Sequence, residues 1–106
     1  MSFFGFFSES DVNEGVNEFK NVSGAVLLDV RTRDEYACGH IENSINVPID
    51  ALHAVESKIK NRNTPVFVYC YSGARSGQAT TLLKRMGYTD VRNIGGIASY
   101  RGKVVR

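Results

Sequence analysis

The residues best suited to chemistry are Cys70 and Arg75, which follow the apolar run Val66–Tyr69 and precede a helical pattern. The run predicts a strand, so Cys70 lies where a strand meets the N-terminus of a helix. Backbone N–H groups and the helix dipole favour negative charge at such a position, and Arg75 adds a full cation. A thiol in this setting has a pKa below the value of about 8.5 for a free cysteine. These residues predict a thiolate nucleophile or a site for an anion.

The length of the loop after Cys70 separates two kinds of chemistry. Four residues stand between the cysteine and the arginine, and a serine follows: Tyr71, Ser72, Gly73, Ala74, then Arg75 and Ser76. This C-x4-R loop resembles the active-site loop of the rhodanese family of sulfurtransferases, whereas the cysteine phosphatases that look related carry a loop one residue longer. In that comparison the shorter loop gathers its N–H groups around the terminal sulfur of a cysteine persulfide. The longer loop forms a cradle for a tetrahedral phosphate.

Several further motifs resemble the same family, in the expected order and at the expected spacing. The family pattern D-V-R, E-[FY], G-H-I, N-[IV]-P and L-x-G-G is matched by Asp29–Arg31, Glu35–Tyr36, Gly39–Ile41, Asn46–Pro48 and Ile94–Gly96. These motifs lie in the region of residues 25–100. We expect residues 1–106 to form one rhodanese-like domain.

The resemblance implies an enzyme, a sulfurtransferase of the thiosulfate:cyanide type that needs no cofactor. Sulfane sulfur would pass from thiosulfate or a persulfide donor, which can be a protein, to cyanide, a thiol or a protein thiol. Cys70 would carry the sulfur as a persulfide, stabilised by the N–H groups of residues 71–76, and Arg75 would orient an anionic donor. Gly73 is expected to adopt backbone geometry that a side chain would forbid. Tyr71 and Ser72 are expected at the mouth of the pocket, where they would select the acceptor.

The family resemblance also implies residues that brace the loop and the end of the sheet: Asp29, Arg31, Glu35 and His40. We predict an ion pair between Arg31 and Glu35 with a structural role. Cys38 is a candidate resolving thiol for the Cys70 persulfide, and the alternative is a buried, inert cysteine. The cysteines and histidines show no familiar metal-ligand spacing, so no metal site is predicted.

Three other functions stay open. A cysteine-dependent phosphatase or arsenate reductase is disfavoured by the four-residue interval and by the lack of an aspartate that stands out as a general acid. A non-catalytic rhodanese-like binding module is disfavoured by the intact Cys70, since inactive relatives commonly lose that cysteine. A carrier that receives sulfur from a dedicated donor protein and never meets thiosulfate is not distinguished from a thiosulfate enzyme by the sequence.

Apolar periodicity predicts the elements that position these residues. Strands are expected near residues 25–29, 44–48, 65–69 and 91–94, with a Gly95–Gly96 turn after the last one. Helices are expected from a cap at Ser8 or Ser10, over residues 49–59, and after Ser76, where the apolar stripe is Ala79, Leu82, Leu83 and Met86 and the C-terminal cap is Gly87. This alternation predicts an α/β fold with a small, mostly parallel central sheet and helices on both faces. Ligands bind such sheets at the carboxyl ends of the strands, where Asp29 and Cys70 fall.

The composition indicates one compact domain and gives no support for a nucleic-acid partner. The 106 residues are 42% hydrophobic, and 13 basic against 11 acidic side chains, spread along the chain, give a charge of +2. No apolar run approaches the roughly 20 residues of a membrane span, and the N-terminus lacks a signal-peptide pattern. We therefore expect a cytoplasmic protein without a membrane partner. The four phenylalanines within residues 3–7 are interpreted as core or edge cover, with a docking tail for a partner as the alternative.

Overall fold

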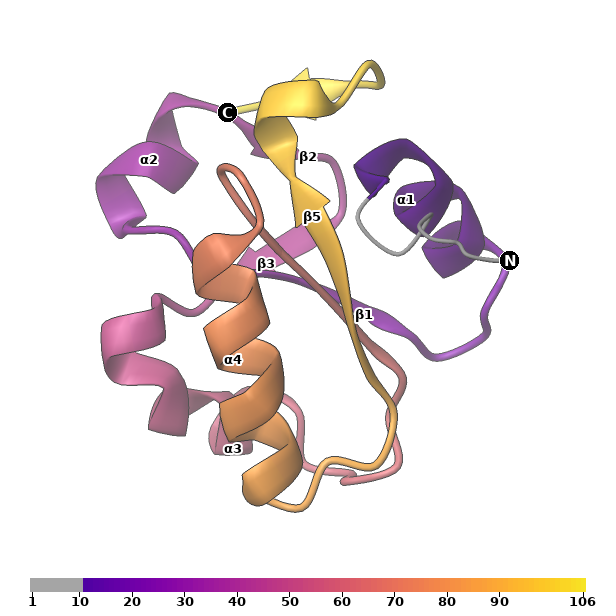
Figure 1. Ribbon diagram of the computed structural model, residues 1–106, viewed down its shortest axis with the longest axis vertical. Coiled ribbons are helices and arrows are strands. Elements are labelled where there is room, and N and C mark those ends of the chain that lie inside the picture. The colour runs from indigo at the N-terminus through magenta and orange to yellow at the C-terminus, as the bar shows by residue number, and fades with distance from the viewer. Residues whose placement is uncertain (1–10) are drawn as a thin grey trace.

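A parallel sheet of four strands forms the centre of the computed structural model, which describes residues 11–106 (Figure 1). The strand order is β3-β1-β4-β5, with β1 (Val26–Asp29), β3 (Ser44–Asn46), β4 (Val66–Cys70) and β5 (Val91–Gly96). Each pair of neighbours runs parallel. A separate antiparallel pair joins β2 (His40–Ile41) to β6 (Val104–Val105). The predicted α/β fold with a mostly parallel sheet is confirmed.

Helices cover both faces of this sheet, as predicted. One face carries α1 (Val12–Lys20), and the other carries η2 (a 3-10 helix, Ile49–Ala54), α3 (Val55–Lys58) and α4 (Ala74–Arg85). Two shorter elements, α2 (Arg33–Cys38) and η3 (Ile97–Ser99), follow the carboxyl ends of β1 and β5. The loop that begins at Cys70 lies at this same end of the sheet, beside the N-terminus of α4.

The strands are apolar on both faces because both faces are covered. In β1 the consecutive residues Leu27 and Leu28 are buried in different clusters, Leu27 with Val12 and Val16 of α1 and Leu28 with Leu83 of α4. Successive strand side chains point to opposite faces, so a strand covered on both sides needs a continuous apolar run. All five residues of β4 are buried, which fixes the backbone that presents Cys70.

The N-terminal cap of α1 differs from the prediction. The helix begins at Val12, and the carboxylate of Asp11 accepts a hydrogen bond from the N–H of Asn13 at 2.9 Å. Asp11 is therefore the cap, and the prediction of Ser8 or Ser10 was wrong. Aspartate and serine are equally good N-terminal caps. The capping residue is therefore the one directly before the first apolar residue of the helix, Val12.

Two helical predictions on the opposite face were also inaccurate. The helix expected over residues 49–59 is η2 followed by α3, interrupted by non-helical backbone at Ala51 (φ −125°). Leu82, predicted on the buried stripe of α4, is 39% exposed, while Ala79 and Leu83 of that stripe are buried. Gly87, which follows the helix at φ 101°, lies in the left-handed region expected of a C-terminal glycine.

The predicted turn at Gly95–Gly96 is wrong, because both glycines belong to β5. Gly95 is paired with Tyr69 and Gly96 with Cys70, after a register shift that leaves Ile94 as an extra residue between Asn93 and Gly95. The shift carries β5 alongside the end of β4 as far as the cysteine. β5 is thus a direct neighbour of the loop.

The Phe-rich start of the chain lies outside the described residues, and so does the prediction made for it. Within residues 11–106, no helix has both the length and the apolar character needed to cross a bilayer.

Candidate active site

Cys70 is the last residue of β4, and its sulfur lies at the start of the following loop. The residue is 1% exposed, the N–H of Gly73 donates to its Sγ at 3.0 Å, and the Oγ of Ser76 lies 3.4 Å from Sγ. Gly73 adopts φ 108°, a conformation that residues with a Cβ rarely take, and this turn aims its N–H back at the sulfur. The next residue, Ala74, begins α4, so the sulfur also lies at the N-terminus of a 12-residue helix.

The surroundings of Cys70 favour its ionised form. Burial opposes ionisation and is the largest single influence on the thiol. Hydrogen bonds from the Ser76 hydroxyl and from the N–H groups of Ser76, Gly73 and Ser72 outweigh it, so the pKa of Cys70 is lowered. Hydrogen bonds, rather than the charge of Arg75, are the main cause of this shift. The site can therefore supply a thiolate, or hold a sulfur anion bonded to Cys70.

We predict that Ser76→Ala raises the pKa of Cys70 and slows its alkylation at neutral pH by about twofold to tenfold. Only the thiolate reacts, so the alkylation rate rises as the pH passes upward through the pKa of the thiol. The lowered pKa of the wild type places this rise below the ordinary range, and loss of the hydroxyl moves it to higher pH. The pH profile of iodoacetamide modification, read on the Cys70 peptide, measures the shift. An unchanged profile would show that Ser76 does not stabilise the thiolate.

Arg75 is held by Glu35 from α2. Its Nη1 and Nη2 donate to the two carboxylate oxygens at 2.8 and 3.0 Å, a bidentate pair in which each side chain is 34% exposed. The Arg75 guanidinium is the main cause that lowers the pKa of Glu35 to about 2, with further hydrogen bonds from Thr32. The pair joins the active-site loop to α2 across 40 residues of sequence.

The predicted Arg31–Glu35 ion pair is wrong, because Arg31 pairs with Asp29. Their side chains are 6% and 0% exposed, and Arg31 donates to the Asp29 carboxylate through Nη2 at 2.8 Å and through Nε. Arg31 Nη2 also donates to the carbonyl of Gly39 at 2.7 Å. This buried pair ties the end of β1 to the end of α2.

His40 contacts Tyr36 and helps to hold α2 against the sheet. Its Nδ1 donates to the carbonyl of Tyr36 at 2.8 Å, and the two rings stack with their centroids 3.6 Å apart. The Tyr36 hydroxyl in turn donates to the carbonyl of Ser44 in β3 at 2.6 Å. These contacts fasten α2, which carries Glu35, to the edge of the sheet.

The comparison with known proteins agrees with the fold. The sequence matches the family described as the Rhodanese-like domain over residues 10–103. The chain belongs to the rhodanese-like family. It is 38% identical to the thiosulfate sulfurtransferase PspE of Escherichia coli over 71 residues, which are 66% of this chain and 68% of that protein.

A second relative shows that the rhodanese-like domain also occurs in larger proteins. The chain is 34% identical to the tRNA uridine(34) hydroxylase of Citrobacter koseri over 108 residues, covering 92% of this chain but only 31% of that protein. Among solved structures, a rhodanese with anions from E. coli aligns with a TM-score of 0.72 at 34% identity, over 77% of this chain and 98% of that one.

Asn93 was not predicted as a site residue of this rhodanese-like domain. It contacts Gly73 and Ser76, the two residues that lie within hydrogen-bond distance of the Cys70 sulfur. Its Nδ2 donates to the carbonyl of Gly73 at 3.2 Å, and its Oδ1 accepts from the N–H of Gly95 at 3.0 Å. Oδ1 also lies 2.7 Å from the Ser76 Oγ and accepts its hydrogen when that hydrogen is not donated to Cys70. One side-chain amide thus fixes the turn, the hydroxyl and the bulge of β5. The only hint in the sequence is an amide side chain directly before Ile94 and the two glycines.

Gly96 was predicted in a turn, but its role is to let β5 approach the loop. A Cβ at this position would lie 2.0 Å from the carbonyl oxygen of Tyr71 and 2.6 Å from the Cα of Ser72. That carbonyl accepts a hydrogen bond from the N–H of Ala98 at 3.0 Å, which fastens the start of the loop to η3. The glycine is required because two backbones meet here.

The remaining predicted loop residues face outward. Tyr71 is 55% exposed, and Ser72 and Ala74 are also exposed, so they are open to a reaction partner. Cys38 is exposed as a free thiol at the end of α2, so the expectation that it would be buried was wrong.

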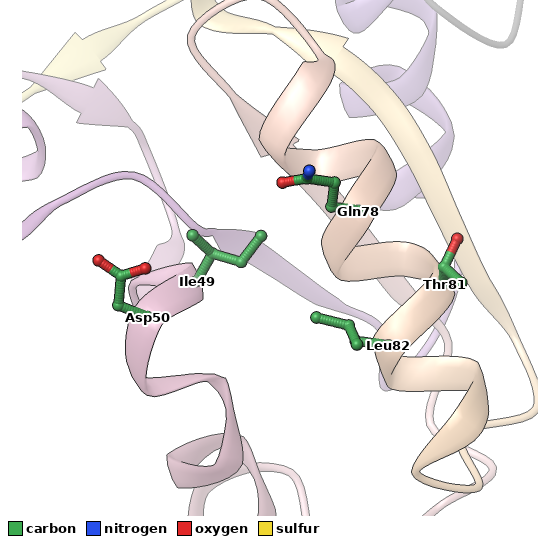
Figure 2. A pocket seen from close by; sticks show the side chains of 5 residues that line it. All are labelled: Ile49, Asp50, Gln78, Thr81 and Leu82. Atoms are coloured by element: carbon green, nitrogen blue, oxygen red, sulfur yellow. The ribbon is translucent and has the colours of Figure 1, made fainter.

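A groove between η2 and α4 is not lined by the Cys70 loop. It has a volume of about 550 Å³ and is lined by Ile49 and Asp50 of η2 and by Gln78, Thr81 and Leu82 of α4 (Figure 2). None of these residues belongs to the Cys70 loop or to the residues that brace it.

Proposed function

We propose that this rhodanese-like chain is a sulfurtransferase that moves sulfane sulfur from thiosulfate or a persulfide donor to cyanide, a thiol or a protein thiol. The observation that carries the proposal is the sulfur of Cys70, held within a C-x4-R loop by the N–H of Gly73 and the Oγ of Ser76. The names of the relatives support sulfur transfer, since one of them is a thiosulfate sulfurtransferase.

In the first step, the Cys70 thiolate attacks the outer sulfur of the donor. The new bond joins Cys70 Sγ to that sulfur, and the donor's own bond to it breaks. With thiosulfate the leaving group is sulfite, which keeps the electron pair of the broken bond, and the terminal sulfur of the persulfide carries the negative charge. The lowered pKa of Cys70 supports this step because it increases the ionised fraction of the nucleophile at a given pH.

In the second step, the acceptor attacks the terminal sulfur and Cys70 leaves as a thiolate. Cyanide becomes thiocyanate, and a thiolate acceptor becomes a persulfide. The N–H of Gly73 already donates to Cys70 Sγ at 3.0 Å, and N–H groups of this loop would stabilise the negative charge of the persulfide. We assign this role to the N–H groups of residues 71–76, and the selection of acceptors to the exposed side chains of Tyr71 and Ser72.

The first test is an assay with thiosulfate and cyanide, run beside an assay with a phosphate monoester such as p-nitrophenyl phosphate. We expect thiocyanate to form and the phosphate ester to remain intact, because the loop is one residue shorter than a phosphatase loop. In a second assay a small organic persulfide replaces thiosulfate. This assay tests whether the protein takes its sulfur from a persulfide donor instead. Hydrolysis of the ester without sulfur transfer from either donor would overturn the proposal in favour of a phosphatase.

A further inference from the structure

The charge of Arg75 is already satisfied within the protein. Arg75 is the one charged residue between Tyr71 and Ser76, and both of its terminal nitrogens donate to Glu35. An anion that approaches the loop therefore meets a neutral ion pair and not a free guanidinium. Arg31, which follows the carboxyl end of β1, is likewise paired, with Asp29.

Hydrogen bonds within α2 hold the Glu35 side chain independently of its contact with Arg75. It occupies the third position of α2 and completes a capping box with Thr32, whose N–H and hydroxyl donate to Oε1 at 3.0 and 3.1 Å. The N–H of Glu35 donates back to the Thr32 hydroxyl at 3.2 Å. The carboxylate thus does not need to be ordered when the pair forms, which favours a persistent pair over a transient surface contact.

We propose that Glu35 is a specificity-determining residue, which neutralises Arg75 and so makes the Cys70 site discriminate against doubly charged sulfur donors in favour of singly charged or neutral ones. The assignment rests on the proposed sulfur transfer and deepens it, because it names the charge class of the donor. Thiosulfate is a dianion, and it gains most from an unpaired cation beside the sulfur. A simple organic persulfide or a thiosulfonate carries at most one negative charge in total and gains less.

The test variant is Glu35→Gln, which removes the negative charge and keeps the shape. A glutamine at this position of a capping box still accepts from the N–H of the capping residue, so α2 is expected to keep its N-terminus. The matched control is Glu56→Gln. Glu56 pairs with Arg62 at 2.9 Å, and Arg62 donates to the carbonyl of Met86 at the C-terminal end of α4, the opposite end from the loop (Figure 1).

The first measurement needs no sulfur-transfer activity. Iodoacetate and iodoacetamide have similar shapes and differ by one negative charge, and their rates are read by mass spectrometry on the Cys70 peptide. We expect Glu35→Gln to raise the iodoacetate-to-iodoacetamide rate ratio by about threefold to tenfold at low salt, and the gain to shrink as salt is added. Glu56→Gln should leave the ratio at the wild-type value. An equal ratio in all three proteins would overturn the assignment.

The second measurement compares thiosulfate with methanethiosulfonate, in which a methyl group replaces one charged oxygen. The same bond breaks in both donors, and the leaving groups are sulfite and methanesulfinate. We expect Glu35→Gln to raise kcat/KM for thiosulfate about threefold to tenfold more than kcat/KM for methanethiosulfonate. If neither of these donors nor a small organic persulfide transfers sulfur to Cys70 of the wild type, the proposed function fails, whatever the alkylation ratio shows. If both transfer sulfur and the preference is unchanged in Glu35→Gln, only the role of Glu35 fails.

Discussion

Replacing Cys70 with serine is expected to abolish thiocyanate formation from thiosulfate and cyanide while the domain stays folded. A serine hydroxyl is not ionised by the hydrogen bonds that lower the pKa of the thiol, and it cannot carry a sulfur atom as a persulfide. The substitution exchanges one atom, and the N–H of Gly73 can donate to the new oxygen. We expect the free energy of unfolding to change by about 1 kcal/mol or less.

The measurement pairs a thiocyanate assay with a thermal unfolding curve for the wild type and for Cys70→Ser. The Cys38→Ser protein is the matched control, because it removes the other thiol, which is exposed at the end of α2. That control should keep the activity if Cys38 plays no resolving part. Thiocyanate formation at the wild-type rate by folded Cys70→Ser would remove Cys70 from the mechanism.

Replacing Gly96 with alanine is expected to damage the site without touching Cys70. The added Cβ would stand 2.0 Å from the carbonyl oxygen of Tyr71, which is backbone and cannot rotate away. Either the loop or β5 must move, at a cost of about 1–3 kcal/mol in stability. A displacement near 1 Å of the groups that hold the sulfur is expected to slow transfer by about a hundredfold.

The matched control is Gly77→Ala, one turn into α4. A Cβ there would lie 3.4 Å from the Nδ2 of Asn93, which is ordinary contact, and alanine favours a helix over glycine. Activity and melting temperature are measured on both variants. Equal activity for Gly96→Ala and the wild type would show that the close approach of β5 does not position the loop.

The elements that carry the site could be predicted because their sequence signals are local. β4 is a continuous apolar run, and its burial on both faces is what such a run requires. Cys70 is the last residue of this strand, and the glycine at φ 108° lies three residues later, so the nucleophile and its turn belong to one short segment of sequence. The parallel order of the sheet follows from the alternation of strands with helices.

The partners within the site could not be predicted, because they depend on contacts between distant segments. Arg31 and Glu35 are four residues apart, the spacing of a helical ion pair, but α2 begins only at Arg33, so the two do not share a helix. The true partner of Glu35 is Arg75, 40 residues away. Asn93 contacts the carbonyl of Gly73, 20 residues away, and a register shift directly after it in β5 places Gly95 and Gly96 beside Tyr69 and Cys70. No sequence pattern predicts that register shift.

The intact mass of the purified, reduced protein before and after a sulfur donor tests the central claim most directly. Thiosulfate and a small organic persulfide are used in separate arms, under non-reducing conditions, with Cys70→Ser beside the wild type. We predict that the wild type gains one sulfur atom on the Cys70 peptide and that Cys70→Ser gains none. No gain by the wild type from either donor, or an equal gain by Cys70→Ser, would contradict a persulfide on Cys70.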